Sequence, residues 1–196
     1  LSYNQANTNT TTEMLGDAFG NSAALMHTAG QEMDTTVAIL GALANEGLKG
    51  SEAGTALSAT MRDIYQKMTK VEDAADATAL AESGLKSVTG DMNDLIGKQV
   101  IQIGDWLVPV SDMNGNFRDM TDIIADVEKA TNGLASAEKT AALSTTFTSR
   151  SIKGMSIHLT EGSDYIKNFR EELRKSYGTA REMSKTLLDN LAGSLT

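Results

Sequence analysis

The sequence predicts a mainly α-helical, multi-helix fold with a small antiparallel β-hairpin or meander around residues 98–118. Three observations support this class. The 196 residues include 17 glycines, one proline and only 5% aromatic residues, which is typical of closely packed helices separated by glycines. Apolar residues recur at three- and four-residue steps over most of the chain. Near residue 98 the pattern changes to runs rich in Val and Ile.

The first helical region is expected over residues 10–85. Thr10 with Glu13 fits a capping box, in which the hydroxyl and the carboxylate bond each other's backbone amides. A second helix is predicted over 33–46, and Gly47 is placed to end it in a left-handed conformation.

Ser51 is predicted to cap the third helix. The apolar residues of this helix follow a helical spacing and predict a buried stripe of Ala53, Leu57, Met61, Ile64 and Met68. The charged, alanine-rich stretch over 70–85 is expected to continue as a more exposed helix.

Two strands are predicted over residues 98–103 and 106–111. Gly104-Asp105 suits the two-residue loop of a hairpin between them. Pro109 has no N–H to donate, so its strand is expected at an edge or open toward solvent there.

The second helical region is expected over residues 119–193. A helix begins at Asp119, and Ser136 is predicted to cap a short helix after it. Two or three further helices are expected, separated by Gly162 and Gly178.

Composition and charge exclude several classes of function. The net charge of −9 argues against a surface built as a whole for nucleic acid or anionic lipid. Without cysteine there is no disulfide, thiolate nucleophile or cysteine-based zinc site. Residues 1–196 are expected to form a single domain, and because the chain starts at Leu1 we expect it to be a fragment of a much longer protein.

His27 and His158 are the only histidines of the chain. Neither has a spaced histidine or paired carboxylates near it, so both are interpreted as half-buried or surface residues rather than catalytic bases. The scattered carboxylates do not define a glycosidase pair. No catalytic, cofactor-binding or metal-binding residue is predicted, and no cofactor.

A calcium loop is the one metal site that residue spacing raises. Asp112, Asn114 and Asn116 match ligand positions one, three and five of such a loop. The loop would then need glycine at Phe117 and glutamate at Ile123, and both are absent. A tight turn is predicted instead.

Gly47, Gly50 and Gly54 stand before or within a predicted helix. They could cradle a phosphate at the helix start, but the lysine and hydroxyl of a P-loop are missing. We interpret them as a corner between two helices with a close contact at a glycine.

Residues 164–185 carry six bases and four acids in an otherwise acidic chain. Ion pairs within the helix, Lys167–Glu171 and Glu171–Lys175, are the favoured explanation. A contact with DNA is the alternative.

Four runs of sequence together resemble the core domain of tail tape measure proteins of tailed phages, the minor tail protein family. They cover 39–57 (helix, glycine corner, helix), 112–124 (turn into an Ile-rich helix), 137–147 and 183–196. Their order along the chain is that of the family, and the likeness is weakest over 71–107.

The resemblance implies a structural virion protein rather than an enzyme. Family members set tail length during assembly and leave the tail tube at DNA ejection. The implied partners are tail tube proteins, tail assembly chaperones and tail-tip proteins, with self-association possible and nucleic acid or a small-molecule substrate not expected. The implied places are the tail tube lumen and, during assembly, the host cytoplasm. The alternative is a module associated with a cell-wall hydrolase or contacting DNA.

Overall fold

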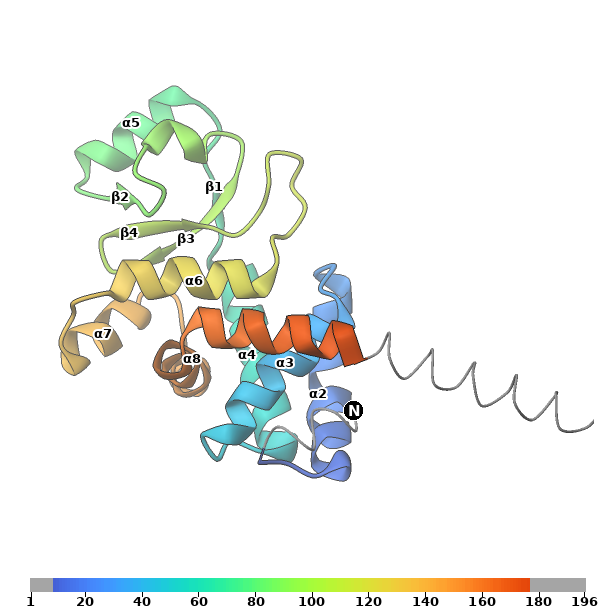
Figure 1. Cartoon of the computed structure of the whole chain (residues 1–196). Helices are drawn as coiled ribbons and strands as arrows, with labels where there is room; N and C mark the ends of the chain where they lie inside the picture. Colours follow the sequence, from blue (N-terminus) through green and yellow to red (C-terminus); the bar gives the residue numbers. More distant parts are fainter. Residues whose placement is uncertain (1–8, 177–196) are drawn as a thin grey trace, which may run out of the picture.

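The computed structural model describes residues 9–176, which form a group of helices below a small sheet (Figure 1). The mainly α-helical class predicted from the sequence is confirmed. The elements follow in the order α2 (Thr12–Thr28), α3 (Met33–Asn45), α4 (Gly50–Lys67), β1 (Thr69–Lys70), α5 (Ala74–Glu82), β2 (Lys86–Ser87), the 3-10 helix η1 (Met92–Leu95), β3 (Gln99–Ile103), β4 (Trp106–Pro109), α6 (Met120–Thr131), α7 (Ser136–Leu143), α8 (Ser149–Glu161) and a helix over 163–176.

Helix α3 lies at the centre of the helical part. Every residue from Thr35 to Ala44 is buried, as expected for a helix that is apolar on all sides. Helix α4 packs against α2 on one side and α8 on the other. The buried apolar side chains of these helices form one core with those of α6 and one face of the sheet.

Two predicted helix caps are wrong by one or two residues. Thr11 rather than Thr10 caps α2, because its Oγ1 accepts a hydrogen bond from the N–H of Met14 at 3.1 Å. Helix α4 begins one residue before Ser51, which therefore lies inside the first turn. There its Oγ accepts a hydrogen bond from Asn21 of α2 at 3.0 Å, so it contacts the neighbouring helix instead of capping its own.

The stretch predicted as one helix over 70–85 is divided into β1, α5 and the start of β2 at Lys86. The reason is a cap: Asp73 Oδ1 accepts hydrogen bonds from the N–H groups of Ala75 and Asp76 at 2.8 and 3.1 Å, which starts α5 at residue 74. The residues before Asp73 are then extended and pair with β3.

The sheet has the order β1-β3-β4-β2. The predicted hairpin is present as β3 and β4, with Gly104 (φ 59°) in its loop. The sheet is mixed rather than purely antiparallel, because β2 pairs with β4 in parallel. Beyond β4, the expected meander continues only as a single antiparallel bridge between Ser111 and Phe117, on either side of the turn at Asn114-Gly115.

Strand β4 is an interior strand, so the edge position expected from Pro109 is wrong. Pro109 is buried as well. The missing N–H is tolerated because β2 lies only beside Trp106 and Leu107 and ends before it reaches the proline.

The two faces of the sheet contact different cores. Ile101, Ile103 and Val108 join the main core, whereas Val100 and Leu107 form a smaller one with α5 and η1. Strand alternation explains this division, since successive side chains point to opposite faces.

The second helical region begins at α6, which starts at Met120, one residue after the predicted start, and has Asp119 as its N-cap. Helix α7 has Ser136 as its first residue, so the predicted cap is off by one; the N–H of Ala135 donates to the Glu138 carboxylate at 3.0 Å. Gly162 (φ 86°) separates α8 from the 163–176 helix. The predicted break at Gly178 lies outside the described residues.

Candidate functional site: a polar network around Asp119

The two histidines lie on different helices and in different environments. His27 is exposed in the last turn of α2. His158 is 3% exposed on α8, and its Nδ1 has no hydrogen-bond partner, so its interpretation as a half-buried or surface residue is wrong. Burial disfavours the charged ring and lowers the pKa of His158 to about 4. With this pKa the buried imidazole of His158 is neutral at pH 7.

The tight turn predicted over residues 112–116 is confirmed. Asp112 Oδ1 accepts hydrogen bonds from the N–H groups of Asn114 and Asn116, both at 2.8 Å, and Oδ2 accepts from the Asn116 side chain at 2.9 Å. The Asn116 side-chain bond is the main reason that the pKa of Asp112 is lowered. The Asp112 carboxylate is thus used inside the turn, and Gly115 (φ 82°) supplies the left-handed residue.

The glycine corner contains the close contact that its residues predict. A Cβ built on Gly54 would lie 2.1 Å from the carbonyl oxygen of Ala18 on α2. Gly47 and Gly50 have φ values of 87° and 55° and turn the chain from α3 into α4. The three glycines therefore serve helix packing and the turn.

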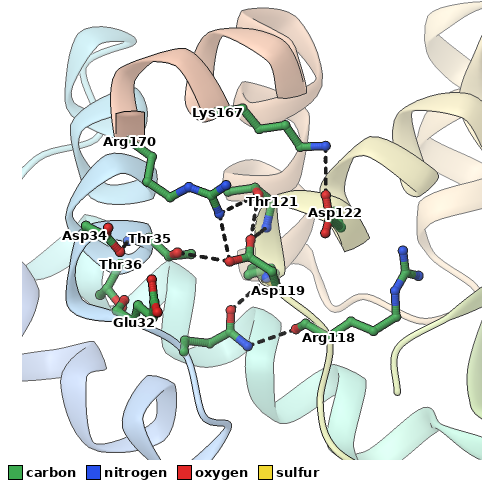
Figure 2. A network of polar contacts seen from close by, with 12 residues as sticks. Glu32, Asp34, Thr35, Thr36, Arg118, Asp119, Thr121, Asp122, Lys167 and Arg170 are labelled. Carbon is green, nitrogen blue, oxygen red and sulfur yellow. Dashed lines mark hydrogen bonds and ion pairs between the residues drawn. The ribbon is translucent and has the colours of Figure 1, made fainter. Parts of the chain in front are cut away.

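The most connected polar side chain of the described residues belongs to Asp119, between α3, α6 and the 163–176 helix (Figure 2). Its Oδ1 accepts from the N–H of Thr121 at 2.8 Å and caps α6. Its Oδ2 accepts from Thr35 Oγ1 at 3.1 Å and from Arg170 Nη1 at 2.8 Å. One carboxylate thus joins three helices.

Burial opposes ionisation of Asp119, but the hydrogen bonds from Thr121 and the charge of Arg170 outweigh it. The pKa of Asp119 is therefore lowered, and the group is a carboxylate at neutral pH. Such a carboxylate is an acceptor and a countercharge. It is not positioned as a general acid.

Gln31 extends the network toward the turn that precedes α6. Its side chain donates to the carbonyl of Arg118 at 2.9 Å and accepts from the N–H of Met120 at 2.7 Å. The Arg118 guanidinium pairs with Asp126 at 2.9 Å. Side chains thus fix the end of the segment that leads from β4 into α6.

The basic residues of the 163–176 helix are engaged mainly by other elements. Lys167 pairs with Asp122 of α6 at 2.8 Å, and Arg174 pairs with Asp34 and Glu32 near the start of α3. Ion pairs are present in this segment, but these residues pair with acids of other elements rather than along their own helix as predicted. The predicted partner of Lys167 is wrong, because the helix faces α6 and α3 with its basic side and Glu171 bonds Arg174 instead. Residues 177–185 of the segment lie outside the described part.

A second buried polar group joins α4 to α8. The Asp63 carboxylate is 6% exposed and accepts from the N–H of Thr148 at 2.7 Å and from its hydroxyl at 2.9 Å. It also accepts from the buried hydroxyl of Ser151. Asp63 therefore caps α8 from 85 residues away.

Two carboxyl groups meet where α3 and α8 end. Burial of Glu161 and its hydrogen bond and repulsion with Glu46 raise the pKa of Glu161. Tyr165 lies beside them and accepts from the side chain of Asn45 at 2.7 Å. Within residues 9–176 no three His, Asp or Glu side chains gather so as to hold a metal ion.

Two grooves of the described surface lie away from the polar network around Asp119. One of 540 Å³ lies between the sheet, α5 and the loop after α7, with Val100, Leu107 and Leu80 in its lining. Another of 550 Å³ lies between the first turns of α4 and α8. None of the helices described here has the length and apolar character needed to cross a membrane.

The geometry of this site supports helix docking rather than a reaction. Sequence reasoning missed the roles of Asp119 and Asp63 toward distant helices, because neither spacing nor composition records contacts between residues more than 50 positions apart. The signal that was available was the position of Asp119 at the predicted start of an apolar helix.

Comparisons with known proteins agree with this structural character. A family model described as phage-related minor tail protein matches residues 1–147. The tape measure protein of Pneumococcus phage Dp-1 is 30% identical over 190 residues. That alignment covers 97% of this chain and 14% of the relative, so the chain spans about one seventh of its length. No solved structure matches. The chain belongs to the phage-related minor tail protein family and is a structural component of a phage tail.

Proposed function

We propose that this chain is a segment of a tape measure that sets tail length during assembly and leaves the tail tube when DNA is ejected. The observation that carries the proposal is the similarity over 97% of the chain to a tape measure protein seven times longer. The structure supports it with side chains devoted to holding helices together.

The proposed partners are the tail tube proteins around the segment, the tail assembly chaperones that bind it before the tube forms, and the tail-tip proteins. The proposed locations are the host cytoplasm during assembly and the tube lumen afterwards. Self-association of the segment is compatible with these contacts. No substrate, cofactor or reaction is part of the proposal.

The charges of the 163–176 helix favour this reading over a DNA contact. Lys167, Arg170 and Arg174 are paired with carboxylates, so binding phosphates would require breaking these pairs. The domain layout that we propose is one unit over 1–196, with the helical regions 10–85 and 119–193 around an insert at 98–118.

The proposal is tested by deleting the 196 codons in frame from a phage that carries this segment. An α-helix rises 1.5 Å per residue. If the tape measure lies in the tail as an extended helix, the deletion is expected to shorten the tail by about 290 Å. Electron microscopy of the particles measures this change. A replacement by an unrelated helical segment of equal length is the control and is expected to restore the tail.

Tails of unchanged length after the deletion would contradict a ruler function. A shortening near 40 Å, about the diameter of a compact domain of this size, would show that the segment stays folded in the tail.

A further inference from the structure

The charges that hold the 163–176 helix are divided between that helix and the rest of the domain. Each base belongs to the helix, and each acid that holds it from outside belongs to α3, α6 or their caps. Figure 2 shows the pairs of Lys167 and Arg170. The pairs, in order along the helix, are Lys167–Asp122, Arg170–Asp119 and Arg174–Asp34. If the helix moved away from α3 and α6, all three ion pairs would break together.

The acidic partners keep other hydrogen bonds if the helix leaves. Asp119 retains the N–H of Thr121 and the hydroxyl of Thr35. Asp34 retains the N–H of Thr35 at 2.7 Å. The start of α6 therefore stays capped by Asp119 without the 163–176 helix, and Asp34 keeps a hydrogen-bond donor.

The ion pairs are open to solvent to different extents. The side chains of Lys167 and Asp122 are 33% and 49% exposed, and those of Arg170 and Asp119 are 16% and 28% exposed. Salt screens such pairs, because the Debye length falls to about 3 Å at 1 M ionic strength. High salt therefore weakens the attachment of this helix.

The packing of α2 against α4 does not depend on exposed charges. It rests on the approach of Gly54 to the Ala18 backbone and on buried apolar side chains. Salt does not weaken apolar burial. The two attachments thus respond differently to the same condition.

Gly162 provides the pivot between α8 and the 163–176 helix. Its φ of 86° and ψ of 145° end α8, and a backbone of this kind is available to glycine at little cost. Ile166, Phe169 and Leu173 are at most 5% exposed and seal the closed form.

We propose that the 163–176 helix is a strap that pivots at Gly162 and detaches before α2, α3 and α4 unfold, with the three ion pairs as its latch. This inference rests on the proposed function and adds to it. Detachment of the 163–176 helix would be the first step by which the folded segment unfolds and passes through the tail tube.

Hydrogen–deuterium exchange of the 196-residue chain, read by mass spectrometry, tests the order of opening. Amides of 163–176 are expected to exchange about tenfold faster in 1 M than in 0.05 M NaCl, the combined effect of loosening three ion pairs. Amides of α4 are expected to show no such change.

Two variants locate the latch. Lys167→Gln and Arg170→Gln are each expected to speed exchange over 163–176 at low salt and to reduce its dependence on salt. The matched control is Lys153→Gln, which removes an exposed pair between Lys153 on α8 and Glu52 on α4. It is expected to leave 163–176 unchanged.

If the amides of 163–176 and of α4 changed their exchange rates by the same factor under all conditions, the two would open as one cooperative unit. That result would contradict the separate detachment of the 163–176 helix. An equal effect of Lys153→Gln and Lys167→Gln on the strap would overturn the latch. The tail-length experiment uses phage particles and no exchange data, so failure of the ruler and failure of the strap are separate results.

Discussion

Gly54 is the position where a single atom matters most to helix packing. A Cβ there would lie 2.1 Å from Ala18 O and 2.8 Å from its carbonyl carbon, both backbone atoms of α2 that cannot rotate away. Gly54→Ala is expected to destabilise the domain by about 3 kcal/mol, because α2 and α4 must move apart. Urea unfolding measures the loss.

Gly20→Ala is the matched control for that change. Gly20 also lies inside a helix, but a Cβ there meets nothing within 4 Å. Its higher helix propensity is expected to stabilise the domain by up to about 1 kcal/mol. Equal effects of the two substitutions would contradict the close contact.

His158 gives the domain a dependence on pH. Its folded pKa of about 4 lies below the ordinary 6.5, so the unfolded chain takes up the proton first as pH falls. The contribution to stability is complete above pH 6.5, decreases between 6.5 and 4, and levels off at a loss of about 3 kcal/mol.

His158→Leu is expected to remove this part of the pH dependence, measured as unfolding free energy at pH 7 and pH 4.5. His27→Gln changes an exposed ring and is expected to leave the dependence intact. Carboxylates contribute equally to both proteins and cancel in the comparison. A wild-type slope in His158→Leu would contradict the buried neutral histidine.

At the scale of elements, α8 depends on a cap that another helix supplies. Asp63→Ala removes the acceptor of the Thr148 N–H and of two hydroxyls, one of them on fully buried Ser151. The expected cost is about 3 kcal/mol, since a lost cap and unsatisfied buried donors add together.

Asp73→Ala, which removes the exposed cap of α5, is the comparison. Its expected cost is about 1 kcal/mol. Thermal unfolding followed by circular dichroism measures both variants. If the two cost the same, the buried position of Asp63 adds nothing to its role as a cap.

The sequence predicted elements well where local chemistry decides them. Apolar spacing and glycines located α2, α3, α4 and α6, and the Gly104 loop located the hairpin. It missed β1 and β2, which have two residues each and form only because β3 and β4 offer an edge on either side. Strands this short carry no alternation to detect.

For the polar site, the sequence predicted that ion pairs form but not which residues form them. Basic residues spaced along 164–176 indicated ion pairs, and ion pairs are present. Their partners are 45 to 140 positions away, so helical spacing suggested the neighbour Glu171 for Lys167 where the fold supplies Asp122. The burial of His158 depends likewise on which helices cover α8.

At the scale of the whole molecule, the buried core of the described residues is aliphatic: Leu, Ile, Val and Met predominate, alanines fill many of the remaining positions, and the buried aromatic residues are Phe147 and Phe169. We expect a modest stability, with thermal unfolding in the range of about 45–65 °C typical of mesophilic domains. Differential scanning calorimetry of the chain checks this. A midpoint above about 90 °C would contradict an easily threaded segment.

Asp63 also has a consequence for the order of synthesis. Residues 12–67 leave the ribosome before Thr148 and Ser151 exist, so the half-made chain exposes the side of α4 that α8 later covers. The Asp63 carboxylate lies near one end of that surface, where it is expected to hold water and to discourage premature association between nascent chains. Once α8 has been synthesised, the same carboxylate accepts hydrogen bonds from Thr148 and Ser151 and holds α8 against α4.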